Sequence, residues 1–154
     1  MIKGSLAQDL GKARRYLPQY MRNFTDSTSK ELRDNVRDFT PVDTGELKAS
    51  IETIPTTRRI TGTGTHVWSG GAKSELRRAS FTEYDTAPHI IRAKTDAGLR
   101  FFSAAAGGTV VRQEVFHPGT TGAHMFSRGA DKTDAELGPR AEAMLLRWKV
   151  RYGL

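Results

Sequence analysis

A run of residues at helical spacing ends abruptly at Pro41, and this boundary constrains the fold more than any other feature of the sequence. Because proline lacks an N–H and disfavours helical geometry at Thr40, the helix is expected to stop near Phe39. Upstream, mostly apolar side chains recur every three or four residues, which predicts an amphipathic helix over about residues 5–39. They are Leu6, Leu10, Ala13, Leu17, Met21, Phe24, Thr28, Leu32, Val36 and Phe39. Pro18 interrupts the pattern, either as a kink or as the start of a second helix. Packing on a sheet is the simplest role of this helix, and a subunit interface is the alternative.

The residues after Pro41 predict a tight corner followed by a short helix. Asp43 and Thr44 are both suitable N-caps, and Glu46 follows Asp43 at the spacing of a capping box. Gly45 would then lie in the first turn of the new helix. We interpret Pro41, Asp43, Thr44 and Gly45 as a structural turn motif without a chemical role.

Between Ile51 and Trp68 the pattern changes to threonine-rich, β-favouring sequence broken by glycines. It predicts a hairpin with its turn near Pro55–Arg58 and a second strand that ends at about Trp68. Arg58 and Arg59 would then lie exposed near the turn. They are either ordinary solvated charges or contacts to a phosphate backbone.

The rest of the chain alternates between short strands, loops and helices. The expected order is a flexible joint at 69–74, a short helix from Ser74 to about Tyr84, strands at 89–92, 99–102 and 108–116, and a polar loop at 117–124. A final amphipathic helix is predicted over about 130–152, with basic residues in its last turns that suit the helix dipole. The predicted fold class is α+β, with a long N-terminal helix and a C-terminal helix packed on a small, mostly antiparallel β-sheet with extended loops. We expect a single domain over residues 1–154, with sheet and loops at about 50–125.

Composition favours an acidic partner and argues against disulfide or thiolate chemistry. The net charge is +7, and there is no cysteine, which fits a protein made in a reducing cytoplasm. Basic residues are spread along the sequence, and such dispersed charge suits sequence-independent attraction better than base reading. No apolar run of 18 residues exists, so we expect no transmembrane helix and no membrane partner.

The residue types that bind metals or transfer protons are present but poorly arranged. The candidates for a metal site are His66, His89, His117 and His124, with Glu83 and Asp85. None of these histidines shows the HExxH spacing, and no cysteine completes a zinc set. Glu83 and Asp85 are also a possible general acid and base, but such a pair is common by chance. We therefore predict no enzyme, no metal and no cofactor.

Three stretches, in order, resemble a family of neck proteins from long-tailed bacteriophages, the putative tail-component or tail-completion proteins. The first is TPVDTGELKASI, residues 40–51, and the second is FTEYDTAPHIIRAK, residues 81–94. The third is HPGT followed by Met-Phe, within residues 117–126. The sequence departs from the family pattern at Asp85, where the family usually has glycine, and at Ala93, where it usually has proline.

The resemblance implies a structural virion protein that joins the tail tube to the head connector. The implied protein forms a homo-oligomeric ring, expected to be a hexamer, through which genomic DNA passes. Its other partners would be the head connector or stopper protein and the tail tube or tail terminator protein. The implied location is the neck or tail of the virion, after assembly in the host cytoplasm. The residues expected at subunit or partner interfaces are Arg58, Arg59, Trp68, His117, Pro118, Gly119, Thr120, Met125 and Phe126.

Two other hypotheses remain open. A stand-alone, non-specific nucleic-acid-binding protein would explain the charge, and its monomer would bind duplex with micromolar affinity that falls steeply with salt. A hydrolase that uses His117 or His124 is the third, and full activity after changing both histidines to alanine would exclude it.

Overall fold

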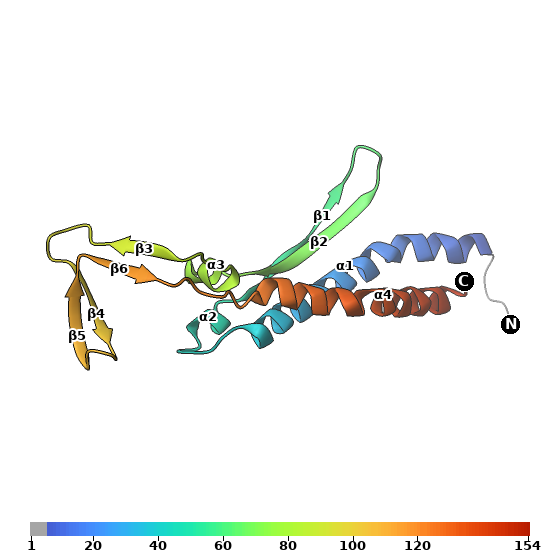
Figure 1. Cartoon of the computed structure of the whole chain (residues 1–154). Coiled ribbons are helices and arrows are strands. Elements are labelled where there is room, and N and C mark those ends of the chain that lie inside the picture. Colours follow the sequence, from blue (N-terminus) through green and yellow to red (C-terminus); the bar gives the residue numbers. More distant parts are fainter. Residues whose placement is uncertain (1–5) are drawn as a thin grey trace.

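The computed structural model describes residues 6–154 and has an elongated shape built from two long helices and three antiparallel strand pairs (Figure 1). The helices are α1 (Leu6–Phe39), α2 (Glu46–Ala49), α3 (Arg78–Glu83) and α4 (Met125–Tyr152). The strands are β1 (Glu52–Ile60), β2 (His66–Lys73), β3 (His89–Arg92), β4 (Leu99–Ser103), β5 (Gly108–Arg112) and β6 (Glu114–His117). The predicted α+β class, with a long helix near each end, is confirmed. The strands form three separate two-stranded sheets, however, rather than the one small sheet expected.

The two long helices lie side by side and antiparallel, so that the start of α1 and the end of α4 meet at one end of the molecule (Figure 1). Asn35 of α1 donates its Nδ2 hydrogen to Oγ1 of Thr133 of α4 at 3.0 Å, and both residues are buried. Gly129 packs directly on Val36, where a side chain would not fit. These contacts fix how the two helices are aligned.

α1 continues through Pro18, so the interpretation of Pro18 as the start of a second helix is wrong. A proline inside a helix removes one backbone hydrogen bond, and packing against α4 supports this part of α1. Ala13 is fully buried, and its carbonyl accepts a hydrogen bond from the indole N–H of Trp148 at 3.2 Å. The predicted first helical residue, Ser5, lies outside the described residues. α4 begins at Met125, earlier than predicted.

The corner after α1 has the predicted shape but a different cap. α1 ends where expected, and α2 follows after the turn. The N-cap of α2 is Gly45, whose φ of 79° lies in the left-handed region. The Thr44 hydroxyl accepts a hydrogen bond from the backbone N–H of Glu46 at 3.4 Å, as a capping side chain does, but Asp43 and Glu46 do not form a capping box. Instead, the carboxylate of Glu46 pairs with the guanidinium of Arg78 from α3. The capping box predicted between Asp43 and Glu46 is therefore wrong, because α2 begins after Gly45, two residues beyond Asp43.

The buried core is small and lies where α1, α2, α3 and α4 meet. Its fully or nearly fully buried side chains are Val36, Leu47, Ile51, Ala79 and Met125. Leu32, Phe39, Ala72, Leu76 and Phe126 pack around them. The core therefore brings together three parts of the chain, namely the corner after α1, helix α3 and the start of α4.

β1 and β2 form a long hairpin that packs on α1 at its base and projects beyond it (Figure 1). Its turn lies at residues 61–65, so the turn predicted at Pro55–Arg58 is wrong. The register of the pair shifts between Ile54 and Thr57, beside Pro55. Such an irregularity lets a strand contain a proline that cannot donate a ladder hydrogen bond.

Residues 69–74, predicted to be a flexible joint, instead belong mostly to β2. Gly70 lies so close to Ser29 of α1 that a Cβ atom there would overlap the Ser29 hydroxyl. A Cβ on Gly70 would also lie 3.2 Å from the Thr56 hydroxyl. The glycine therefore allows close packing of strand and helix, and is not a sign of flexibility.

The second projection, which we call the arm, runs from β3 and β6 to the β4–β5 hairpin at its tip (Figure 1). The strand predicted at 108–116 is divided at Gln113. Val111 therefore pairs with Arg100 in the tip, whereas Val115 pairs with Ile91 in the β3–β6 segment. The strand predicted at 89–92 is confirmed, and the helix before it, α3, is shorter than predicted.

Candidate assembly surfaces

The elongated shape leaves an unusually large surface exposed. The chain has a solvent-accessible surface of 11290 Å² and a mass of 17.0 kDa. A compact monomer of this mass is expected to expose about 7,700 Å², so the excess is about 3,600 Å². The hairpin and the arm, which project from the helix pair, account for this shape (Figure 1).

The arm exposes apolar side chains on both of its faces. Ile90 of β3 lies opposite Phe116 of β6, and their exposed fractions are 52% and 66%. On the other face Ile91 lies opposite Val115, and Ile91 is also exposed. At the tip, Phe102 is 72% exposed. Each strand of the arm pairs with one neighbour, so every strand also has an open edge that can add a strand from another chain.

The arm is joined to α4 by a buried carboxylate. The backbone N–H groups of Phe126 and Ser127 donate to Glu83 at 2.8 and 3.0 Å, and the Ser127 hydroxyl donates to it at 2.8 Å. Burial alone would raise the pKa of Glu83, but these three hydrogen bonds and the nearby His124 outweigh it and hold that pKa below its usual value. Glu83 therefore caps the N-terminus of α4 from a distant part of the chain.

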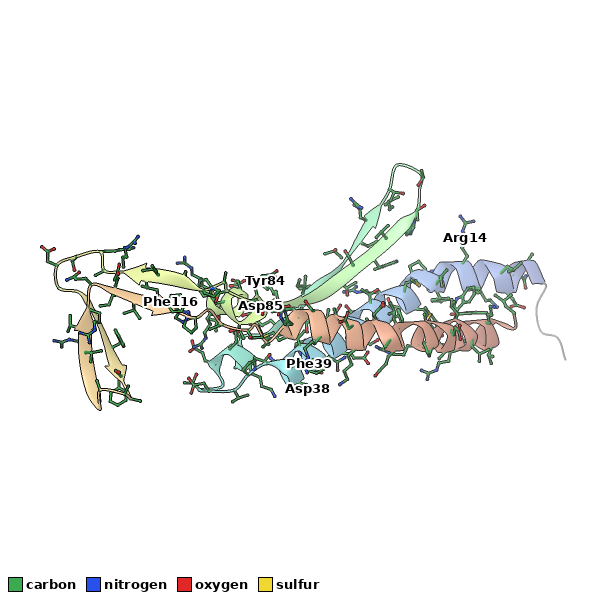
Figure 2. All side chains as sticks on the ribbon, in the orientation of Figure 1. Arg14, Asp38, Phe39, Tyr84, Asp85 and Phe116 are labelled. Carbon is green, nitrogen blue, oxygen red and sulfur yellow. The ribbon has the colours of Figure 1, made fainter. Side chains whose placement is uncertain are left out.

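A second set of contacts fixes the base of the arm just beyond Glu83. Asp85 accepts a hydrogen bond from the backbone N–H of Gly122 at 2.7 Å, and its Oδ1 lies 3.4 Å from Nε2 of His124. The backbones of Thr86 and Thr120 exchange two hydrogen bonds, at 2.9 and 3.2 Å. Figure 2 shows Asp85 close to the start of α4, between the arm and the helix pair. The arm is therefore held to the helix pair by paired polar contacts.

The loop predicted to contact neighbours at residues 117–124 is ordered by contacts within the chain. The rings of His117 and His89, which face each other across β3 and β6, stack with their centroids 5.1 Å apart. Gly119 donates to Nδ1 of His117 at 3.1 Å. Its φ of 85° lets it pack against the Thr86 carbonyl. Pro118 is exposed between them.

Met125 and Phe126, also predicted at a partner interface, belong to the core instead. Met125 is fully buried, and the hydroxyl of Thr40 donates to its sulfur at 3.4 Å. Phe126 is half-buried and packs against the same core. Met125 is therefore covered by the chain itself, and its predicted partner contact stays a prediction. Thr120 is exposed, and its hydroxyl is hydrogen-bonded to Thr86.

Arg58, Arg59 and Trp68 lie within the hairpin rather than at its turn. Arg58 is paired with Trp68 in the ladder, and its guanidinium carbon lies 5.6 Å from the centroid of the indole ring. Its Nη2 is also 2.7 Å from Nδ1 of His66. Arg59 alternates to the opposite face and is exposed. Arg58 is thus engaged inside the hairpin, and the two arginines do not form one basic patch.

The corner motif borders a shallow cavity of about 250 Å³ at the surface. Pro41, Asp43, Thr44 and Gly45 line it, together with Arg78 and Thr82 of α3. Val42, at the tip of the corner, is 66% exposed. The corner therefore buries Leu47 in the core on one side and exposes the apolar side chain of Val42 on the other.

The alternative catalytic and metal hypotheses gain no support from the geometry. Glu83 and Asp85, considered as an acid–base pair, accept hydrogen bonds from backbone N–H groups. His66 contacts Arg58, and within residues 6–154 no three metal-ligand side chains gather into a site.

The net positive charge of the described residues is concentrated at one end of the helix pair. Residues 6–23 and 140–154 together contain eight lysines and arginines against two acidic residues. Residues 24–139 contain fifteen of each and are neutral overall. Because α1 and α4 are antiparallel, the two charged segments lie side by side (Figure 1). The basic residues are therefore spread over the molecule, as predicted, but the excess of basic over acidic residues is greatest at this end.

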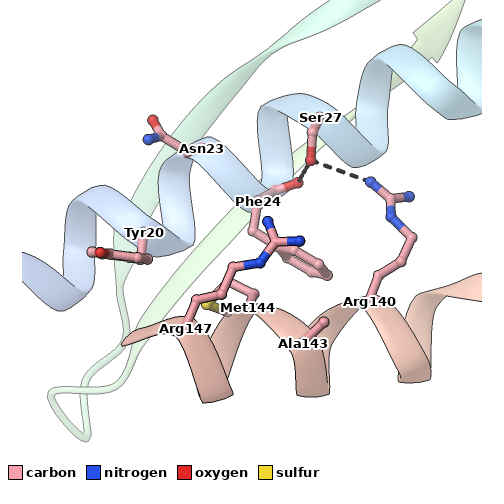
Figure 3. A pocket seen from close by; sticks show the side chains of 8 residues that line it. All are labelled: Tyr20, Asn23, Phe24, Ser27, Arg140, Ala143, Met144 and Arg147. Carbon is pink, nitrogen blue, oxygen red and sulfur yellow. Dashed lines mark hydrogen bonds between the residues drawn. The ribbon is translucent and has the colours of Figure 1, made fainter. Parts of the chain in front are cut away.

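A groove runs along the seam between α1 and α4 at this basic end, and sequence reasoning missed it. It consists of two cavities of about 320 and 530 Å³, both of which Tyr20 and Asn23 line. Arg147 lines the first, where Figure 3 shows it extending from α4 toward α1. Arg151 and Tyr152 line the second. The sequence signal was the spacing of the arginines of α4 by seven and four residues, which places them along one helical face.

Comparison with protein-family models, with curated proteins and with solved structures finds no match to the chain. The described part of the chain also has no helix that is long and apolar enough to cross a bilayer. Any function must therefore be argued from the geometry and from the sequence resemblance.

Proposed function

We propose that this protein is a non-enzymatic, structural subunit of a bacteriophage virion, which forms a ring at the junction of head and tail. The single observation that carries the proposal is the exposed surface, which exceeds that of a compact monomer by about 3,600 Å². A subunit of a ring has two neighbours, and standard interfaces bury about 800 Å² of each partner. The excess is therefore large enough for both neighbours and for a further partner.

The chemistry of the projections fits contact between copies of the chain. Apolar side chains on both faces of the arm, such as Ile90 and Phe116, lack a covering layer within the chain. A projecting element that packs on a different surface of the next copy makes a heterologous contact, and such contacts close into a ring when the rotation allows it. The arm is well suited to this role because Glu83 and Asp85 fix its base to the helix pair.

The sequence resemblance to tail-completion proteins gains a structural rationale. Its three stretches, residues 40–51, 81–94 and 117–126, are far apart in the sequence but meet around the core and the base of the arm. These stretches therefore orient the arm, which is the element that we propose for contact between copies. We propose the tail tube or its terminator on one side of the ring and the head connector or stopper on the other.

The competing proposal is a stand-alone, non-specific nucleic-acid-binding protein. The basic end of the helix pair favours it, because eight basic residues in one region can contact phosphates without reading bases. The exposed apolar arm is left without a role in that proposal. The ring proposal accommodates both features.

Mass measurement separates the two proposals. The purified full-length protein is measured alone and after incubation with isolated tails that lack it. The ring proposal expects multiple copies on each tail in a fixed number. A protein that ignores tails and coats duplex DNA as a monomer contradicts the ring and supports the alternative.

A further inference from the structure

The net charge of the described residues is concentrated at the end of the helix pair where α1 begins and α4 ends. Of the described residues, those outside 6–23 and 140–154 sum to zero formal charge. The paired ends of α1 and α4 therefore carry a net excess of six positive charges, whereas the rest of the described chain is neutral as a whole. A field of one sign at one end of an elongated molecule selects an anionic partner for that end.

The groove at this end, which we call the seam groove, is lined by hydrogen-bond donors. The donors include Tyr20, Asn23, Arg147 and Arg151, and the apolar side chains Phe24, Ala143 and Met144 also line the first cavity. No carboxylate lines either cavity. Arginine, tyrosine, asparagine and glutamine are side chains that donate to phosphate oxygens in nucleic-acid backbones.

Two of the arginines are available for a ligand. Arg147 and Arg151 are exposed, and neither forms an ion pair with any residue of 6–154. Arg140 differs, since it pairs with Glu31 and donates to the Ser27 hydroxyl at 3.2 Å, as Figure 3 shows for Ser27. Arg147 and Arg151 are therefore the charges that a ligand can neutralise.

The shape of the seam groove is also fixed before any ligand binds. The rings of Tyr16 of α1 and Tyr152 of α4 stack with their centroids 6.0 Å apart and nearly parallel. Trp148, whose ring meets that of Tyr152 edge-on, is anchored to Ala13 by its indole N–H. These contacts hold the ends of the two helices together, so the backbone positions of Arg147 and Arg151 are fixed relative to α1.

We infer that the seam groove binds the sugar-phosphate backbone of double-stranded DNA, without base recognition, through Arg147 and Arg151. This inference rests on the proposed function and deepens it, because it identifies the face of the subunit toward the genome. Arg147 and Arg151 are one helical turn apart, about 6 Å along the axis, so both can contact one short run of phosphates. In a ring, the same contact repeated by each copy would guide DNA without holding it at one sequence.

An acidic protein surface is the other class of partner with suitable charge, and DNA is favoured by the lining of the groove. The core of a protein interface is usually apolar and depleted in charge. The seam groove presents guanidinium, amide and phenol groups beside the apolar side chains Phe24, Ala143 and Met144, and these polar groups match a repeating anion. Exposed apolar side chains lie on the arm and also on α4 at Leu146 and Val150, so competition with an acidic polypeptide is part of the test.

The test compares two double variants of the full-length chain that lose the same charge. Arg147→Gln with Arg151→Gln changes the seam groove, and Arg58→Gln with Arg59→Gln changes the hairpin. Binding to a fluorescent 24-base-pair duplex is followed by anisotropy between 50 and 200 mM NaCl. Loss of two phosphate contacts is expected to reduce the slope of log K against log salt by about 1.8, and the hairpin variant is expected to keep the wild-type slope. Equal slopes for the two variants overturn the inference.

A third variant and a competitor make the outcome specific. Arg147→Lys with Arg151→Lys retains both charges and is expected to keep most of the slope; a slope as low as that of the glutamine variant would instead indicate a structural role. If poly-glutamate displaces the duplex at equal charge concentration and binds more tightly, the groove serves an acidic protein and the DNA assignment is overturned.

Failure of the inference and failure of the proposed function give different results. A protein that is found in multiple copies at the head–tail junction, but whose seam variant binds duplex like wild type, refutes only the inference. A protein that never joins the virion but binds DNA through Arg147 and Arg151 refutes only the ring.

Discussion

Gly129 of α4 lies against Val36 of α1 so closely that a Cβ on Gly129 would be 2.6 Å from Cγ2 of Val36 and 2.9 Å from its backbone nitrogen. Backbone cannot move aside as a flexible side chain can. This crossing point therefore sets the separation of the two long helices, and with it the shape of the seam groove and the placement of the arm.

Gly129→Ala is expected to destabilise the protein by about 1–3 kcal/mol, because the helices must separate around the added methyl group. Gly11→Ala is the control, since a Cβ on Gly11 has no neighbour within 4 Å. It is expected to stabilise the protein by about 0.4–1 kcal/mol through helix propensity and the unfolded state. Urea unfolding of both variants measures these changes, and equal effects would contradict the close packing.

The buried hydrogen bond from Asn35 to Thr133 is expected to couple the same two helices. The Thr133 hydroxyl accepts this hydrogen bond and also donates to the Gly129 carbonyl at 2.8 Å. Asn35→Ala and Thr133→Ala are each expected to cost about 1–3 kcal/mol, because each leaves a buried polar group without its partner. The double variant should cost less than the sum by at least about 0.5 kcal/mol. Strict additivity in urea unfolding would show that the bond does not link the helices.

The depressed pKa of Glu83 predicts a pH dependence of stability. A carboxylate whose pKa is lower in the folded state contributes stability above its unfolded pKa of about 4.3, and this contribution disappears as pH falls through the folded pKa. Glu83→Gln is therefore expected to lower stability at pH 7 and to flatten the loss of stability on acidification. Urea unfolding of wild type and Glu83→Gln between pH 3 and 7 measures how the free energy of unfolding depends on pH.

Glu142→Gln, at an exposed position of α4, is the matched control for Glu83→Gln and should leave the pH profile unchanged. An identical acid limb in wild type and Glu83→Gln would show that Glu83 does not carry the effect.

The sequence was sufficient for features that depend on neighbours along the chain. The three- and four-residue spacing identified α1, and Pro41 marked its end at Phe39. Prediction failed where a distant residue decided the conformation. Gly70 was interpreted as a sign of flexibility, but the Ser29 hydroxyl of α1 occupies the place of a side chain there.

The candidate site shows the same division. Glu83 read as a possible acid because its true partners, the N–H groups of Phe126 and Ser127, are more than forty residues away. The basic end was hidden because its two halves lie at opposite ends of the sequence. Pro55 read as a turn residue, although a shift in strand register accommodates it.

The arm is expected to serve assembly rather than folding. Ile90→Ser with Phe116→Ser should change the free energy of unfolding of the monomer only slightly, by about 0.5 kcal/mol or less per exposed site, yet abolish incorporation into tails. Leu146→Ser with Val150→Ser, equally exposed on α4, is the control and should still assemble. Mass measurement with isolated tails gives the readout. Loss of assembly in the control alone would place the interface on α4 and contradict the role of the arm.

Imaging of intact virions tests the central claim most directly, namely that this chain is a repeated subunit at the junction of head and tail. With the protein marked by a bound antibody fragment, we predict a ring of several equivalent copies at the collar, each in contact with two neighbours. Absence of the chain from the collar, or a single copy without neighbours, would contradict the account.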